Sequence, residues 1–203
     1  MRRGGLGDMI DSQALEAITD LMSLLTGDVA ADERGVDMTN RAPIRLAESE
    51  GELLWYDGGL ITFKATGKQT DESLLFFEIQ MPVGKATPLH IHPQSDETFY
   101  LLEGEILVHS DGTDDTAGPG AVVSIPRGTP HAFMVKSPTA RMLVSFTPAD
   151  PVSEAFFREV GEPASAATLS PSPPPTVEEF MGAAKRSGMQ ILGPPPFAAS
   201  AVG

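Results

Sequence analysis

Three of the four histidines in this chain, together with one glutamate, have the spacing of a metal site. His90 and His92 are two residues apart, so on a β-strand both side chains point to the same face. Glu97 is expected on the next strand, and His131 follows a Pro-Arg-Gly-Thr-Pro turn further along the chain. Three imidazoles and one carboxylate converging inside a barrel suit a divalent first-row transition ion. Because these four ligands leave open positions on an octahedral ion, we predict a reactive site rather than a structural one.

The alternative is a polar cluster that binds no ion, which would bury three imidazoles and a carboxylate without a compensating cation. We favour the metal site. Iron, manganese, nickel, cobalt, copper and zinc all accept this ligand set, so the prediction is one divalent transition metal ion of unspecified identity. With neutral imidazoles and one carboxylate, the site keeps a positive charge. It should therefore attract an anionic oxygen such as a phenolate, enolate or carboxylate.

These residues lie in two stretches that resemble the two signature motifs of the cupin superfamily, a group of small β-barrel metalloproteins. The stretches are Gly84-x5-His90-Ile91-His92-x4-Glu97-x6-Gly104 and Gly120-x5-Pro126-Arg127-Gly128-x2-His131. The one departure is Val135, where the second motif often ends in asparagine, and that position is not a ligand. The resemblance covers roughly residues 58–160. It implies an all-β fold, the double-stranded β-helix or jelly-roll barrel, flanked here by N- and C-terminal helices.

Composition narrows the remaining classes. The chain has 203 residues, enough for one domain with a proper core, and a formal net charge of −14 with a pI near 4.5. That acidity argues against binding to nucleic acid or to anionic membranes. Cysteine is absent, so disulfides and thiolate sites are excluded. The basic start is interrupted by Asp8 and Asp11 before an apolar signal segment develops, and we expect a soluble, cytoplasmic protein.

Short apolar runs separated by glycine and proline turns predict an antiparallel barrel or jelly roll. The expected strands cover residues 52–56, 60–63, 74–81, 98–102, 106–109, 121–125, 132–135 and 141–146. We predict three regions: an N-terminal extension over 1–50 with a helix over 12–25, the barrel over 51–150, and a tail over 151–203. In the tail, a short helix over 152–160 precedes a proline-rich connector. A second helix follows the capping box of Thr176 and Glu179 and ends at Gly188.

The alternation of inward and outward side chains along the strands predicts which apolar residues line a substrate pocket. Counting by two from Glu97 puts Phe99 and Leu101 on the inward face, and counting from His131 puts Phe133 there. Phe76 is a further candidate, because its strand must neighbour the metal-binding strand. These side chains either build a pocket around the metal or are plain barrel core.

A looser resemblance suggests a reaction. The run from Thr66 through Phe76-Phe77 to Thr87-Pro88, and the later Phe156–Glu159 segment, resemble single-domain proteins of the quercetin dioxygenase-like group. This implies an oxygenase that adds O₂ to a small aromatic or enolic molecule. Glu97 would then be both a metal ligand and the catalytic base that takes the substrate hydroxyl proton. Two alternatives remain: an O₂-independent isomerase, lyase or decarboxylase, and a non-catalytic binding or sensing barrel.

We also expect a homodimer. Tyr100 and Leu102 alternate out of register with the inward residues, so apolar side chains remain on the outer face of the barrel. The tail carries apolar residues that cannot form a core by themselves and need a partner surface, either the barrel mouth or a second subunit. These tail residues are Phe180, Met181, Ile191, Leu192 and Phe197. The alternative is a monomer whose tail folds back on its own barrel.

Overall fold

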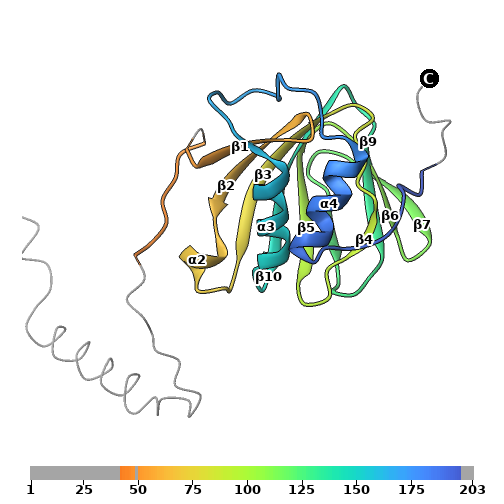
Figure 1. The fold of residues 1–203 in the computed structure, drawn as a ribbon, viewed down its shortest axis with the longest axis horizontal. Coiled ribbons are helices and arrows are strands. Elements are labelled where there is room, and N and C mark those ends of the chain that lie inside the picture. Colours follow the sequence, from red (N-terminus) through yellow and green to blue (C-terminus); the bar gives the residue numbers. More distant parts are fainter. Residues whose placement is uncertain (1–41, 49, 198–203) are drawn as a thin grey trace, which may run out of the picture. The chain divides into compact units, whose positions relative to one another are not determined.

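The structure, a computed structural model, describes residues 42–48 and 50–197. All helices and strands of the described residues lie in the second of two units into which the chain divides, residues 44–203. The helix predicted over residues 12–25 lies outside the described residues. Within the second unit, the strands form two antiparallel β-sheets, with helices at one side (Figure 1).

The larger sheet has seven strands in the order β11-β1-β2-β3-β10-β5-β8. Their bounds are β1 Glu52–Tyr56, β2 Gly59–Ala65, β3 Leu75–Pro82, β5 Asp96–Glu103, β8 Val122–Ile125, β10 Thr139–Thr147 and β11 Glu162–Pro163. The smaller sheet has five strands in the order β12-β4-β9-β6-β7. These are β4 Leu89–Ile91, β6 Ile106–Ser110, β7 Thr113–Ala117, β9 His131–Val135 and β12 Gln190–Gly193.

Two antiparallel sheets with an apolar interior confirm the predicted all-β jelly roll, although the sheets are not closed into a barrel. The core lies where the inward faces meet. In β3, every second residue from Leu75 to Met81 is buried, and in β10 the same alternation runs from Ala140 to Phe146. Side chains on alternate positions share a face, so each strand contributes one apolar row to the core.

Two glycines with positive φ have different roles, one in a tight turn and one in close packing. Asp57 and Gly58 both have positive φ, 46° and 82°, which is the two-residue turn that joins β1 to β2 with the expected hairpin register. Gly104, the last glycine of the first motif, has φ 77° and lies directly against the carbonyl oxygen of Thr139. A side chain there would collide with the backbone of β10, so this motif glycine serves packing.

Three helices accompany the sheets. The short α2 (Gly67–Thr70) was not predicted. The predicted tail helices are α3 (Pro151–Val160) and α4 (Val177–Ser187). Asp150 is the N-cap of α3. The capping box of Thr176 and Glu179 begins α4, and Gly188 in the left-handed conformation ends it, both as predicted. We call residues 151–193, which contain α3, α4 and β12, the C-terminal cover.

The C-terminal cover docks on its own chain. Strand β12 adds to β4 at the edge of the smaller sheet. Helices α3 and α4 lie side by side (Figure 1), and Phe180 of α4 packs edge-on against Phe156 of α3 with the ring centroids 5.0 Å apart. The indole nitrogen of Trp55 donates to the carbonyl of Thr168 in the proline-rich connector, at 3.0 Å. The tail therefore folds back on its own sheets, which removes one of the two reasons for expecting a dimer. Dimerisation stays a prediction, as does the division of the chain at residue 150.

The other reason is still present on the outer face of the larger sheet. Tyr100 of β5 is 43% exposed and Val122 of β8 is 63% exposed.

Of the helices in the described part of the chain, none has the length and apolar character needed to cross a membrane.

Candidate metal centre

The four predicted ligands lie together between the two sheets. His90 on β4 and His131 on β9 are direct partners across the smaller sheet, and His92 follows β4 at once. Glu97 projects from β5 of the larger sheet. One donor atom from each of the four residues lies within 4.8 Å of the other three. His92, Glu97 and His131 are buried and His90 is half-buried, so the spacing in the sequence does translate into one compact group.

Each of the three imidazoles of the cluster makes a hydrogen bond through its Nδ1 atom. His90 pairs with the carbonyl oxygen of Pro88 at 2.8 Å and His131 with that of Thr129 at 2.9 Å. His92 pairs with a carboxylate oxygen of Asp150 at 2.8 Å. Carbonyl and carboxylate oxygens only accept, so each Nδ1 carries the proton. In the neutral ring, Nε2 then keeps its lone pair for a metal ion, which is the arrangement usual for metal-binding histidines.

One atom of the cluster indicates that a cation belongs there. His92 Nε2 is buried and has no hydrogen-bond partner, lying 3.4 Å from a carboxylate oxygen of Glu97. Buried polar atoms are nearly always satisfied, so an unpartnered nitrogen aimed at a carboxylate needs an explanation. A divalent ion bound by Nε2 and by the carboxylate would satisfy both. The group of three histidines and one glutamate could therefore hold a transition metal ion.

Burial and mutual contact shift the ionisation of the cluster. Burial, reinforced by the neighbouring His131, lowers the pKa of His90 to about 4. Burial alone would also lower the pKa of His92, but its interactions with Asp150 and Glu97 raise it to about 9. For Glu97, burial would raise the pKa, yet His131 and His92 hold it below its ordinary range. At neutral pH, without a cation, Glu97 is anionic and His92 carries the compensating charge.

Comparison with known families decides the assignment of the fold. Residues 77–146, a range that includes His90, His92, Glu97 and His131, match the family model described as Cupin domain. The chain contains a cupin domain. The resemblance of its motifs to the cupin signature is thus confirmed.

Named relatives place the cupin domain near the quercetin dioxygenase group. The chain is similar to quercetin 2,3-dioxygenase of Bacillus subtilis, with 28% identity over 151 residues, covering 72% of this chain and 44% of that protein. It is also similar to germin-like protein 3-5 of Oryza sativa, with 38% identity over 77 residues, covering 34% of each chain. This chain spans less than half the length of either. A solved structure described as a predicted oxalate decarboxylase from Thermotoga maritima matches with 22% identity and a TM-score of 0.46, covering 53% of this chain and 99% of that one.

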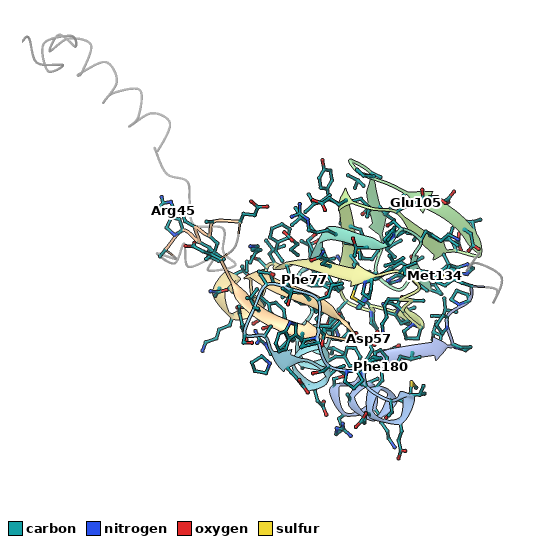
Figure 2. All side chains as sticks on the ribbon, turned by 90° about the horizontal axis from the view of Figure 1, so that it is seen from above. Arg45, Asp57, Phe77, Glu105, Met134 and Phe180 are labelled. Atoms are coloured by element: carbon teal, nitrogen blue, oxygen red, sulfur yellow. The ribbon has the colours of Figure 1, made fainter. Side chains whose placement is uncertain are left out.

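An apolar cavity of about 70 Å³ opens beside the cluster of the cupin domain. Asp57, Phe77 and Phe180, which lie near one another in Figure 2, all line it. The two sheets supply its aromatic and aliphatic walls, while the C-terminal cover supplies the rest. The lining from the cover is Phe156, Phe157, Phe180, Met189 and Ile191. Such a cavity, apolar with a few converging polar groups, is typical of a small-molecule site.

The predicted pocket residues divide into two groups. Phe99 and Phe133 line the cavity, with their rings 5.7 Å apart. Leu101 is fully buried in the core and does not line it. Phe76 requires a correction: it is half-buried on the outer face of β3, and its neighbour Phe77 lines the cavity instead. The alternation in β3 buries the odd-numbered residues, and that parity was not fixed by any motif residue on the strand.

Sequence reasoning missed Asp150, which binds His92 from a position 58 residues along the chain. The pair Asp150-Pro151 is a recognisable helix start in the sequence, but no local signal shows which side chain the Asp150 carboxylate contacts. The fourth histidine, His109, pairs with Asp114 at 2.6 Å on the hairpin of β6 and β7, away from the cluster.

Polar groups on the cavity wall outside the cluster are few. Asp57 is engaged by Lys85 in an ion pair of 2.7 Å. Burial, aided by the charge of Asp57, raises the pKa of Tyr56, so its hydroxyl stays protonated. A ligand in this cavity would meet a donor hydroxyl group, a neutralised carboxylate and the metal-binding cluster, and otherwise apolar surface.

Proposed function

We propose that this protein is a metal-dependent cupin dioxygenase that adds O₂ to a small aromatic or enolic molecule. The observation that carries the proposal is the similarity to a quercetin 2,3-dioxygenase, which covers 72% of this chain. The four-residue cluster beside an aromatic cavity supports it. This chain spans less than half the length of that relative, so we do not carry the relative's substrate over to it and propose the substrate class separately.

In this proposal His90, His92, His131 and Glu97 hold one divalent transition metal ion. The bound ion would supply a Lewis acid that lowers the pKa of a substrate hydroxyl group. Glu97 is the base that takes the hydroxyl proton, since it is the only carboxylate of the cluster. Its depressed pKa makes it a weak base in the metal-free state, so the proton transfer requires an acidified substrate.

The cavity limits the substrate. Its volume is about 70 Å³, whereas an engineered apolar cavity of about 150 Å³ holds a single benzene ring. A flavonol with three rings is therefore larger than this cavity as it stands. A small enol or single-ring phenol is closer to its size. We expect the substrate to present an anionic oxygen to the metal and an apolar face to Phe99, Phe133 and Phe77.

The same small cavity favours one rival, a cupin isomerase, lyase or decarboxylase that needs no O₂ and acts on a compact enolisable acid. Oxygen consumption separates the two. Metal-free protein is loaded in turn with iron, manganese, nickel, cobalt, copper and zinc. Each form is then tested in an oxygen electrode with a panel that runs from single-ring enols and catechols to flavonols.

We expect O₂ uptake with at least one pair of metal and substrate, abolished in Glu97→Gln and retained in the matched control His109→Ala. His109 is a suitable control because it has the residue type of the three histidines of the cluster but lies outside it. Turnover under anaerobic conditions without O₂ uptake would replace the dioxygenase by the isomerase or lyase. Saturable binding with no turnover of any kind would instead identify a binding module.

A further inference from the structure

The three histidines of the cluster are held in two different ways. His90 and His131 each donate to a backbone carbonyl two residues upstream, so their orientation is set by their own turns. His92 instead donates to the side chain of Asp150, which belongs to the start of α3. Among the described residues of the cluster, His92 is thus the one ligand whose orientation depends on a side chain outside the cupin motifs.

Asp150 is saturated by hydrogen bonds on both oxygens. Oδ1 accepts from the backbone nitrogens of Val152 and Ser153, at 3.0 and 3.2 Å, which caps α3. Oδ2 accepts from His92 Nδ1 and from the hydroxyl of Ser153, both at 2.8 Å. The carboxylate is only 8% exposed, and Ser153 is fully buried. A buried carboxylate with every bond accounted for is a fixed support rather than a solvated surface charge.

From this geometry we infer that Asp150 is a positioning residue of the metal centre. It keeps His92 in the tautomer with the proton on Nδ1, so that Nε2 faces the cluster with a free lone pair. It also ties this ligand to α3, the helix whose Phe156 and Phe157 form part of the cavity wall. The inference rests on the proposed metal centre and adds a residue of the C-terminal region to it.

Only a group that accepts on both oxygens can do this. An asparagine of the same shape could keep its oxygen toward the backbone of Val152 and Ser153, with its amide hydrogens toward His92. Nδ1 of His92 would then have to accept, which moves the ring proton to Nε2 and blocks metal binding. In the opposite orientation the amide hydrogens would meet the backbone N–H groups of the helix, and the N-cap would be lost.

The test measures Co²⁺ affinity of the full-length metal-free protein by its visible absorption. Wild type is compared with Asp150→Asn and with Glu154→Gln, a matched control. Glu154 lies in the same first turn of α3 and bonds to Arg158 and to the backbone of Gly67, not to the cluster. We expect Asp150→Asn to weaken Co²⁺ binding by about 10- to 100-fold, as is usual for partners behind a metal ligand. Glu154→Gln should bind as wild type does.

A second variant guards against misfolding. Ser153→Ala removes one bond to Asp150 Oδ2 and the 3.2 Å contact of the same hydroxyl with His92 Nδ1, and it leaves the N-cap bonds of the backbone in place. It should therefore keep the melting temperature of the metal-free protein within a few degrees. A weaker Co²⁺ affinity with unchanged melting supports the positioning role even if Asp150→Asn fails to fold. Unchanged affinity in the folded Asp150 variant, or in Ser153→Ala when the Asp150 variant does not fold, overturns it. Equal weakening in Glu154→Gln also overturns it, because helix charge would then be the cause. If wild type itself binds no Co²⁺, the metal centre fails and not merely this inference.

Discussion

The cupin domain and the C-terminal cover contribute to one cavity in opposite ways. The cupin domain, residues 77–146, supplies all four residues of the cluster. The cover, residues 151–193, supplies five side chains to the cavity wall and every one is apolar. The cover therefore contributes only to cavity shape, whereas the cupin domain supplies both the cluster and much of the remaining cavity wall.

This difference indicates what each region can change independently. The cluster is fixed by short turns, by strand pairing and by burial between two sheets, which leaves little freedom for its ligands. The cover meets the cluster at its N-terminal end, where Asp150, the residue directly before it and the N-cap of α3, bonds to His92, and through the pairing of β12 with β4. Substitutions of the cover residues that line the cavity should alter which molecules fit, while substitutions in the cluster should alter whether a metal binds at all.

Removal of a ligand should produce the largest effect. In His90→Ala the ion loses one imidazole, and because even partners behind a ligand are worth about 10- to 100-fold, we expect at least ~100-fold weaker metal affinity. Titration of the metal-free protein with Co²⁺ or Ni²⁺ measures this. His109→Ala is the control and should bind normally. Full metal occupancy in His90→Ala would show that the cluster is not the metal site.

The pH dependence of metal uptake should be the next largest effect. The pKa of His92 is raised to about 9 in the metal-free fold, and the ring must lose a proton before Nε2 can bind. Affinity should therefore rise as pH increases from about 6.5, by up to tenfold per unit, and level off near pH 9. Stability of the metal-free protein changes in the opposite direction. The contribution of His92 is fully present below about pH 6.5 and is lost as pH rises through about 9.

Binding titrations between pH 6 and 10 test this sign. The cover lines the cavity with apolar groups that do not ionise, so substitutions there should leave the pH profile in place. A metal affinity that falls as pH rises through this range would contradict the assignment of the titrating group to His92.

Features that depend on contacts within a short stretch of the chain could be predicted from the sequence, whereas those that depend on contacts between distant segments could not. The strand over residues 52–56 and the capping box of Thr176 were predicted with their observed bounds, because local periodicity and capping determine them. The four cluster residues were predicted from their spacing. Strand β7 was missed because Thr113–Ala117 is polar and mostly exposed, and it is held by backbone pairing with β6 alone.

The remaining omissions involve contacts between distant segments. Phe180 and Ile191 were expected to need a partner surface, but their sequence does not identify the cavity as that surface. The contact of Asp150 with His92 joins two loops whose meeting depends on the whole fold. The misplacement of Phe76 shows the same limit within one strand, since a shift of one residue exchanges the two faces.

Phe180→Ala should change selectivity more than metal binding. Phe180 is half-buried against Phe156, and truncating a fully buried phenylalanine destabilises by about 3–5 kcal/mol, so we expect about 1–2 kcal/mol here. The enlarged cavity should favour bulkier molecules in the substrate panel. The neighbouring Met181→Ala is the control, because Met181 is 44% exposed on the same helix. Identical selectivity in the two variants would mean that the cover does not limit the substrate.

The smallest effect is expected where the cover can be loosened without touching the cavity. In Thr176→Ala the hydroxyl that accepts from the backbone of Glu179 is lost, and N-cap substitutions of this kind cost about 1 kcal/mol. Thermal unfolding should show that loss, and Thr176→Ser, which keeps a hydroxyl group, should restore most of it. Metal affinity should be equal in both variants, because α4 supplies no ligand and no partner to a ligand. If Thr176→Ala weakened metal binding as well, the cover and the cluster would be one cooperative unit, and the independence of shape from chemistry would have to be abandoned.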